Sequence, residues 1–212
     1  VANALLVHVV PLPPALTACF ARDVRDADLL ARFRHVFLGD STTGDSDSDA
    51  ARVGAGTAVW GTMAGLLGDR LLACAEGREL LALGRTFFAH ASAAVRAAAF
   101  SCWSFVAQTV ARLSTQGRGR GEGQDAYMDA DGDADGDAEA HTALVMEPFL
   151  HMLDAGETAG DVLTSAFRCW MAFVMKLDVA RLVAAFGGVV AVFVQRLCAA
   201  DAVSDFFVAQ LC

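Results

Sequence analysis

A run of regularly spaced aspartates between Asp129 and Asp137 is the first feature that could do chemistry. A calcium-binding EF-hand loop needs acidic or amide ligands at positions 1, 3 and 5, glycine at position 6 and glutamate at position 12. Counting from Asp131 satisfies the first four requirements, but the twelfth residue is Thr142, which cannot bind a cation in bidentate fashion. We therefore interpret the run as a solvated acidic linker, with weak and non-specific cation binding as the alternative.

Other residue patterns do not indicate a catalytic or cofactor site. The five histidines form no HxxH or HExxH group, and the chain has no GxSxG or Walker-type GxxxxGK pattern. The segment 117–123, GRGRGEG, has the composition of a nucleic-acid contact, but no aromatic residue is interleaved and acids follow it. We expect no enzyme, cofactor, metal or small-molecule substrate. A pocket joining two of His90, His151, Asp154 and Glu157 would revive an enzymatic function.

Four arginines on predicted helices are the candidates for contacts with phosphates or with a partner protein, because they recur at three- and seven-residue spacings. These candidates are Arg22, Arg25, Arg32 and Arg34. The alternative, which we favour, is a solvated helix face whose charge is balanced by neighbouring acids. Those acids are Asp23, Asp26 and Asp28.

The net charge of −9 belongs to two polar segments, 39–52 and 117–140, which carry −3 and −6. Both segments are rich in Gly, Asp or Ser and nearly free of apolar residues, so burial cannot offset the entropy lost on ordering them. We predict that 39–52 is a disordered loop and that 117–140 is a disordered acidic insert. The remaining chain is formally neutral and has no global attraction for DNA.

Apolar residues elsewhere recur at three- and four-residue steps, which is the period of a helix. The clearest predicted helices are 91–113, with Ser92 as its N-cap, and a second one that starts near 161. The other predicted helices are roughly 15–21, 24–38, 54–67, 70–89, 141–154, 179–198 and 201–211. We interpret the six cysteines as reduced core thiols of an intracellular protein. No segment has the roughly 18 apolar residues of a membrane span.

A five-residue motif, A-F-x-C-W, ends at Trp103 and occurs again with Trp170. The two tryptophans are 67 residues apart, or 43 when the 24-residue insert is left out. A third tryptophan, Trp60, lies 43 residues before Trp103 in a less similar context. A helical period near 43 is typical of HEAT and armadillo repeats, whose stacked hairpins share a continuous core.

We therefore predict an all-α fold, an α-solenoid of HEAT/armadillo-like helical repeats that covers 1–212 as one domain. Another all-helical bundle is the alternative. Because the chain starts at Val1 and ends in an apolar stretch, we expect it to be part of a longer protein. The predicted repeat core is Trp60, Phe100, Trp103, Phe167 and Trp170.

The segment 88–106 resembles the HEAT-type repeats of the telomere-associated Rap-interacting factor (Rif) family. In those repeats V-R-x-A-A-[FY]-x-x-W precedes an apolar run, and this chain has V-R-A-A-A-F-S-C-W there. The segment 162–174 resembles a second copy, with Leu163 in place of Arg96, and the third copy has Val53 at that position.

This resemblance implies a non-catalytic nuclear scaffold that acts in telomere maintenance, replication timing and double-strand-break repair. Its expected partners are proteins, including a type-one phosphatase, with DNA or chromatin as a second class. The alternative is a HEAT-repeat transport or assembly adaptor, importin-like or phosphatase-scaffold-like, which binds proteins only and is intracellular or cytoplasmic. Steeply salt-dependent DNA binding would distinguish the two functions.

Overall fold

The computed structural model describes residues 13–26, 28–39, 46–116 and 134–177, together with Val183, Ala191 and Gln195. Every element in these residues is helical and none is a strand, which confirms the all-α fold class. The predicted helices 179–198 and 201–211 lie outside the described residues, apart from those three single positions, which are helical. The elements are α2 (Pro14–Asp26), α3 (Leu29–Phe33), the π-helix η2 (Arg34–Leu38), α4 (Ser46–Leu67), α5 (Arg70–Ala73), α6 (Ala75–Phe88), α7 (Ala93–Gln116), α8 (Ala134–Asp154) and α9 (Gly160–Val174).

The contacts between Cα atoms divide the chain into two compact units. Unit 1 comprises residues 1–106 and 159–169, and unit 2 comprises 107–158 and 170–212. Two of the three boundaries fall inside helices, one within α7 and one within α9, and the third lies just before α9. The single repeat domain over 1–212 stays a prediction.

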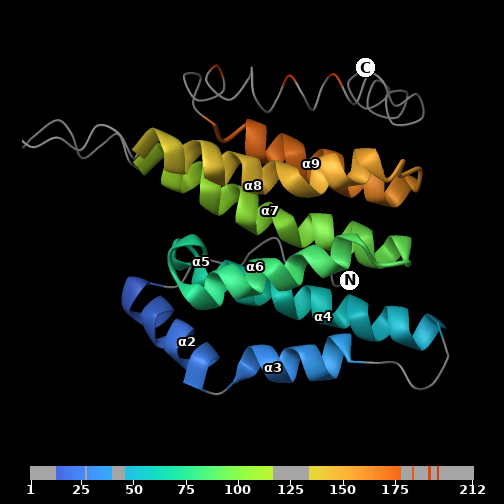
Figure 1. The fold of residues 1–212 in the computed structure, drawn as a ribbon, viewed down its shortest axis with the longest axis horizontal. Helices are drawn as coiled ribbons and strands as arrows, with labels where there is room; N and C mark the ends of the chain where they lie inside the picture. The colour runs from blue at the N-terminus through green and yellow to red at the C-terminus, as the bar shows by residue number, and fades with distance from the viewer. Residues whose placement is uncertain are drawn as a thin grey trace, which may run out of the picture. The chain divides into compact units, whose positions relative to one another are not determined.

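Unit 1 is built on α4 and α6, which pack side by side, with α2 against both (Figure 1). The chain turns from α2 into α3 at Asp28, whose φ of 49° lies in the left-handed region that aspartate tolerates better than most residues. Ser92 directly precedes α7, as expected of its N-cap, and its carbonyl oxygen accepts the first helical bond from the N–H of Arg96.

Aromatic rings form a continuous cluster through the core of unit 1. Trp60 of α4 stacks on Trp103 of α7, with ring centroids 5.9 Å apart and planes 8° apart. Phe87 of α6 meets the edge of Trp60 at 6.1 Å, and Phe88 meets Trp103 at 5.3 Å. Both tryptophans are completely buried, so these contacts hold α4, α6 and α7 together.

The indole of Trp60 lies directly on the backbone of α6. Its Nε1–H donates to the carbonyl oxygen of Leu80 at 2.6 Å. A Cβ atom at Gly84 would stand 2.3 Å from the Trp60 ring, so only glycine leaves room for the indole there. The burial of Trp60 against α6 therefore requires glycine at position 84.

The cysteines of the two A-F-x-C-W motifs are both buried in unit 1. Cys102 Sγ donates to the carbonyl oxygen of Thr57 at 3.4 Å, and a Cβ atom at Gly61 would lie 2.6 Å from the same sulfur. Burial raises the pKa of the Cys102 thiol to about 12, and burial also raises the pKa of the Cys169 thiol. These two cysteines are core thiols, as predicted, whereas Cys19 is exposed.

Unit 2 has its core along α8, where Val145, Met146, Phe149 and Met152 are buried. The helix ends in a Schellman motif at Gly156, whose φ is 64°. The N–H of the following residue donates to the carbonyl oxygen of Met152 at 3.2 Å, and the N–H of Gly156 donates to that of Leu153 at 3.1 Å.

The predicted repeat core is not uniformly buried. Trp60, Phe100 and Trp103 are buried, whereas Phe167 and Trp170 are only half-buried. The second motif is therefore shielded from solvent less completely than the first.

Three sequence expectations are corrected. The loop 39–52 is helical from Ser46 onward, and the insert 117–140 is helical from Ala134 onward. In both cases acidic residues stand in the first turns, where the helix macrodipole favours them, so composition alone was misleading. The predicted helix 70–89 is broken at Cys74, which adopts an extended conformation while its Sγ accepts the N–H of Gly77 at 3.3 Å.

We predict opposite effects for two Gly→Ala substitutions inside helices. Gly84→Ala should destabilise the protein by about 1–3 kcal/mol, because the new methyl group collides with the Trp60 ring. Gly54→Ala is the matched control, since nothing lies within 4 Å of its Cβ position, and it should stabilise by about 0.5–1 kcal/mol. Urea unfolding of both variants measures the change in the free energy of unfolding. Equal changes would contradict the packing of the Trp60 indole against Gly84.

Candidate functional site

Two of the four candidate arginines form ion pairs with α6. The Nε–H of Arg25 donates to the carboxylate of Glu76, and Arg34 Nη1 lies 2.7 Å from Glu79 Oε1. The two glutamates are one helical turn apart, so α6 anchors cations from α2 and η2 side by side. These pairs cancel part of the positive charge that would attract phosphate.

Arg22 and Arg32 occupy more open positions. Arg22 is exposed on α2, and its Nε lies 3.9 Å from the carboxylate of the adjacent Asp23. Arg32 is exposed on α3. The fold therefore brings Arg25 and Arg34 together on α6, but it does not assemble all four arginines into one site.

Glu76 is the most unusual charged group in the described residues. Its side chain is only 8% exposed, whereas that of its partner Arg25 is 66% exposed. The hydrogen bond from Arg25, helped by one from the Glu76 backbone N–H, lowers the pKa of this carboxyl from 4.5 to about 2, although burial opposes the shift. A negative charge therefore persists beneath the guanidinium group well into the acidic range.

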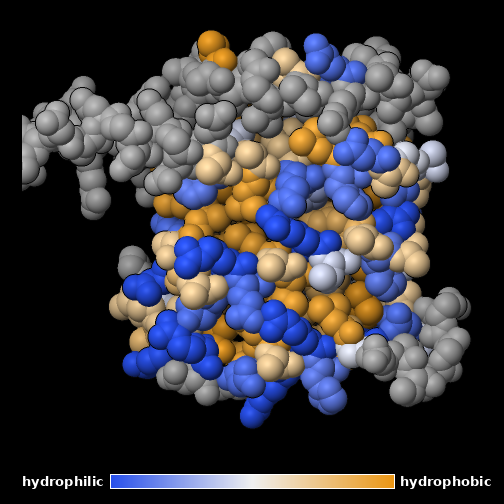
Figure 2. Space-filling view, in the orientation of Figure 1, coloured by the Kyte–Doolittle hydropathy of each residue, from blue (hydrophilic) through white to orange (hydrophobic). Residues whose placement is uncertain are grey.

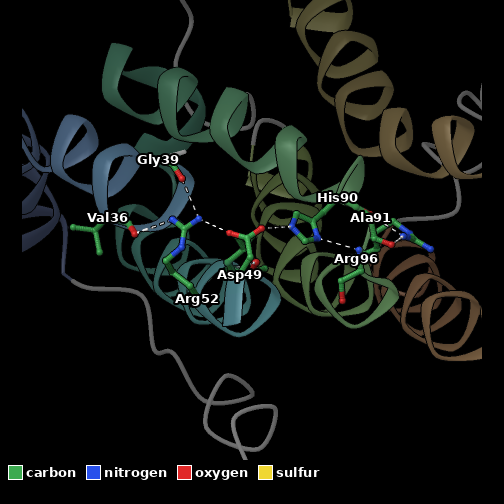
Figure 3. Close-up of polar contacts among 10 residues, drawn as sticks. Val36, Gly39, Asp49, Arg52, His90, Ala91 and Arg96 are labelled. Carbon is green, nitrogen blue, oxygen red and sulfur yellow. Dashed lines mark hydrogen bonds and ion pairs between the residues drawn. The ribbon is translucent and has the colours of Figure 1, made fainter. Parts of the chain in front are cut away.

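A second polar network ties together the ends of several helices in unit 1 (Figure 3). Arg52 of α4 donates to the carbonyl oxygens of Val36 at 3.1 Å and Gly39 at 3.0 Å, and also to the carboxylate of Asp49. The other oxygen of Asp49 lies 3.8 Å from His90 Nε2, in the turn between α6 and α7. The network thus connects the end of η2 and the start of α4 with the turn before α7.

Arg96 repeats near the start of α7 what Arg52 does near the start of α4. Arg96 Nη1 donates to the carbonyl oxygens of His90 at 2.8 Å and Ala91 at 2.7 Å. Each arginine therefore binds backbone carbonyl oxygens of the chain that precedes its own helix: Arg52 those of Val36 in η2 and of Gly39 at its end, and Arg96 those of the turn before α7. The strict 43-residue alignment places Val53 opposite Arg96, so sequence comparison missed Arg52 by one position.

His90 has its ring fixed by this network. Its Nδ1 accepts the backbone N–H of Ser92 at 3.0 Å, so the neutral ring carries its proton on Nε2, the nitrogen that faces Asp49. This geometry gives the histidine a structural role in the turn between α6 and α7.

The segment Arg34–Phe37, with its phenylalanine one position too early for a V-x-F phosphatase-docking motif, is helical. The ring centroid of Phe37 lies 5.0 Å from that of Phe33, and a Cβ atom at Gly56 would lie 2.8 Å from Cγ of the Phe37 ring. This side chain belongs to the contact between η2 and α4, so the segment is not displayed as an extended docking motif.

The pH dependence of the free energy of unfolding should show the contribution of the Arg25–Glu76 pair. Because the folded pKa of Glu76 is lowered, its stabilising effect is present above about pH 4.5 and is lost as the pH falls toward about 2. The free energy of unfolding should therefore fall more steeply over this range in the wild type than in Glu76→Gln.

The matched control for this titration is Glu79→Gln, which removes the other carboxylate that α6 offers to an arginine. The Glu79 side chain is 45% exposed, so water screens its pair more strongly. Urea unfolding at several pH values measures all three proteins. Parallel pH profiles for the wild type and Glu76→Gln would show that Glu76 does not cause the loss of stability in acid.

The histidines and acids singled out from the sequence are divided between the two units. His90 belongs to unit 1, whereas His151, Asp154 and Glu157 belong to unit 2. No group of three or more His, Cys, Asp or Glu side chains in the described residues could hold a metal ion. Within the same residues, no helix has the length and apolar character needed to cross a membrane. No protein-family model, curated protein or solved structure matches this chain.

Proposed function

We propose that this chain is a segment of a non-catalytic α-solenoid scaffold whose function is to bind other proteins. The observation that carries the proposal is the stack of Trp60 on Trp103, two residues 43 positions apart in the sequence. In a solenoid, each repeat contacts its neighbours, and side chains at equivalent positions fill equivalent places in a continuous core.

Two arginines that bind backbone carbonyl oxygens of the chain before their own helices give independent support. Arg52 and Arg96 lie 44 residues apart, and each holds two backbone carbonyl oxygens of the chain before its helix, at the end of η2 for Arg52 and in the turn before α7 for Arg96. A repeated structural unit accounts for two arginines that do the same work at almost the same spacing as the tryptophans. A helical bundle without repeats offers no reason for either correspondence.

The resemblance to Rif-type repeats makes a nuclear scaffold in telomere maintenance, replication timing and double-strand-break repair our first proposal for the parent protein. Arg96 is the arginine of the V-R-x-A-A pattern, and it binds the loop that leads into its helix. The second proposal is an importin-like or phosphatase-scaffold-like adaptor in the cytoplasm or elsewhere in the cell.

Among possible partners, the charges of unit 1 favour proteins over DNA. The guanidinium groups of Arg25 and Arg34 are already paired with carboxylates of α6. Counterion release drives DNA binding, and it is largest for unpaired cations that meet phosphates. The second proposal, an adaptor that binds proteins only, gains support from the same pairing.

Nuclease treatment tests whether proteins bind the scaffold directly. The full-length parent protein is purified from cells with its partners, before and after digestion of nucleic acid. We expect a defined set of proteins to remain bound after digestion: chromatin and replication proteins for a Rif-type scaffold, or transport and phosphatase components for an adaptor. Loss of all partners after digestion would contradict the proposal.

DNA retardation provides the complementary measurement on the purified chain. We expect no retardation of duplex DNA at about 50 mM salt, where non-specific electrostatic binding is strong. The control variant Arg22→Ala/Arg32→Ala removes the two candidate arginines that lie outside the α6 pairs. Retardation with a steep salt dependence that this variant abolishes would instead establish direct DNA binding.

A further inference from the structure

The outer face of α6 carries cations in regular register. Arg78 and Arg85 are both exposed and are separated by seven residues, which is two helical turns or about 10.5 Å. Ala82 lies between them on the same exposed stripe, so α6 itself places no large side chain between the two positions. In the sequence this pair does not stand out, because acidic residues lie close to it along the chain.

Two further cations flank this stripe. Arg25 and Arg34 reach α6 from neighbouring helices, and their side chains are 66% and 45% exposed. Their partners differ in burial, since Glu76 is 8% exposed and Glu79 is 45% exposed. Four exposed arginines therefore lie on or beside α6 together with two carboxylates, of which only Glu79 is well exposed, because Glu76 lies beneath its arginine.

Figure 2 shows strongly hydrophilic side chains gathered over the region that α2, α5 and α6 occupy in Figure 1. The helix that carries the stripe is held rigidly, because the Trp60 indole binds the carbonyl oxygen of Leu80 and fills the space left by Gly84. A rigid display of cations lowers the entropy lost when a partner binds. We name the set of Arg25, Arg34, Arg78 and Arg85 the α6 arginine stripe.

We propose that the α6 arginine stripe is the docking surface for an acidic peptide segment of a partner protein. The proposal rests on the protein-binding function proposed above and names the chemistry of the partner. Acidic side chains seven residues apart on a helix match the spacing of Arg78 and Arg85. A continuous phosphate backbone fits less well, because it would meet the exposed carboxylate of Glu79, where a peptide can place a neutral residue.

Fluorescence anisotropy of the full chain with a labelled peptide tests this surface. The probe is a 20-residue alanine-based helix with glutamates seven residues apart, and the matched probe has glutamine in their place. We expect salt-sensitive binding of the glutamate peptide only, weakened at least about tenfold by Arg78→Ala/Arg85→Ala. The matched control Arg22→Ala/Arg32→Ala removes the same charge elsewhere in unit 1 and should change the affinity less than about twofold.

Several outcomes would overturn the proposal. Equal losses in both double variants would show general electrostatic attraction without a docking surface. Tighter binding of single-stranded DNA, lost in Arg78→Ala/Arg85→Ala, would identify a nucleic-acid surface. Binding that appears only after deletion of 118–133 would assign the stripe to the acidic insert of the chain itself. If the peptide does not bind but protein partners still remain after nuclease digestion, the docking surface is wrong while the proposed scaffold function still holds.

Discussion

The packing of Trp60 against α6 is the contact on which the rest of unit 1 depends. One buried indole binds a helix backbone through Nε1, occupies the space that Gly84 leaves and stacks on Trp103 of α7. The helices α4, α6 and α7 thereby meet at a single side chain. An indole placed this way contributes both burial of a large apolar surface and a satisfied donor, and neither can be kept if the helices separate.

The same arrangement determines how charge is presented. Because α6 is fixed from below by Trp60, its outer face holds Glu76 and Glu79 where arginines from α2 and η2 can reach them. The buried Glu76 keeps its charge through a hydrogen bond from Arg25, which leaves that guanidinium largely in solvent. Trp60 thus packs against one side of α6, and the exposed arginines lie on its other side. This helix links the proposed scaffold core to the proposed partner surface.

Periodicity predicted the helices well, because buried positions such as Val95, Cys102 and Trp103 recur on one face of α7. It could not predict that Ser46 starts a helix, because acidic residues are common both in disordered loops and in first helical turns. The break at Cys74 could not be predicted, because neither Cys74 nor its two neighbours is glycine or proline. Pairing of Arg25 with Glu76 joins residues 51 positions apart, so local spacing on one helix carried no information about it.

A double-mutant cycle between Trp60 and Trp103 tests the central claim most directly. The free energy of unfolding is measured by urea for the wild type, Trp60→Leu, Trp103→Leu and the double variant. Stacked aromatic pairs are worth about 0.5–1.5 kcal/mol beyond their buried area, so we expect each single change to be strongly destabilising and the pair to be coupled by at least about 0.5 kcal/mol. Strictly additive effects would show that the two tryptophans act independently, and this would contradict the account of a repeat core built on their contact.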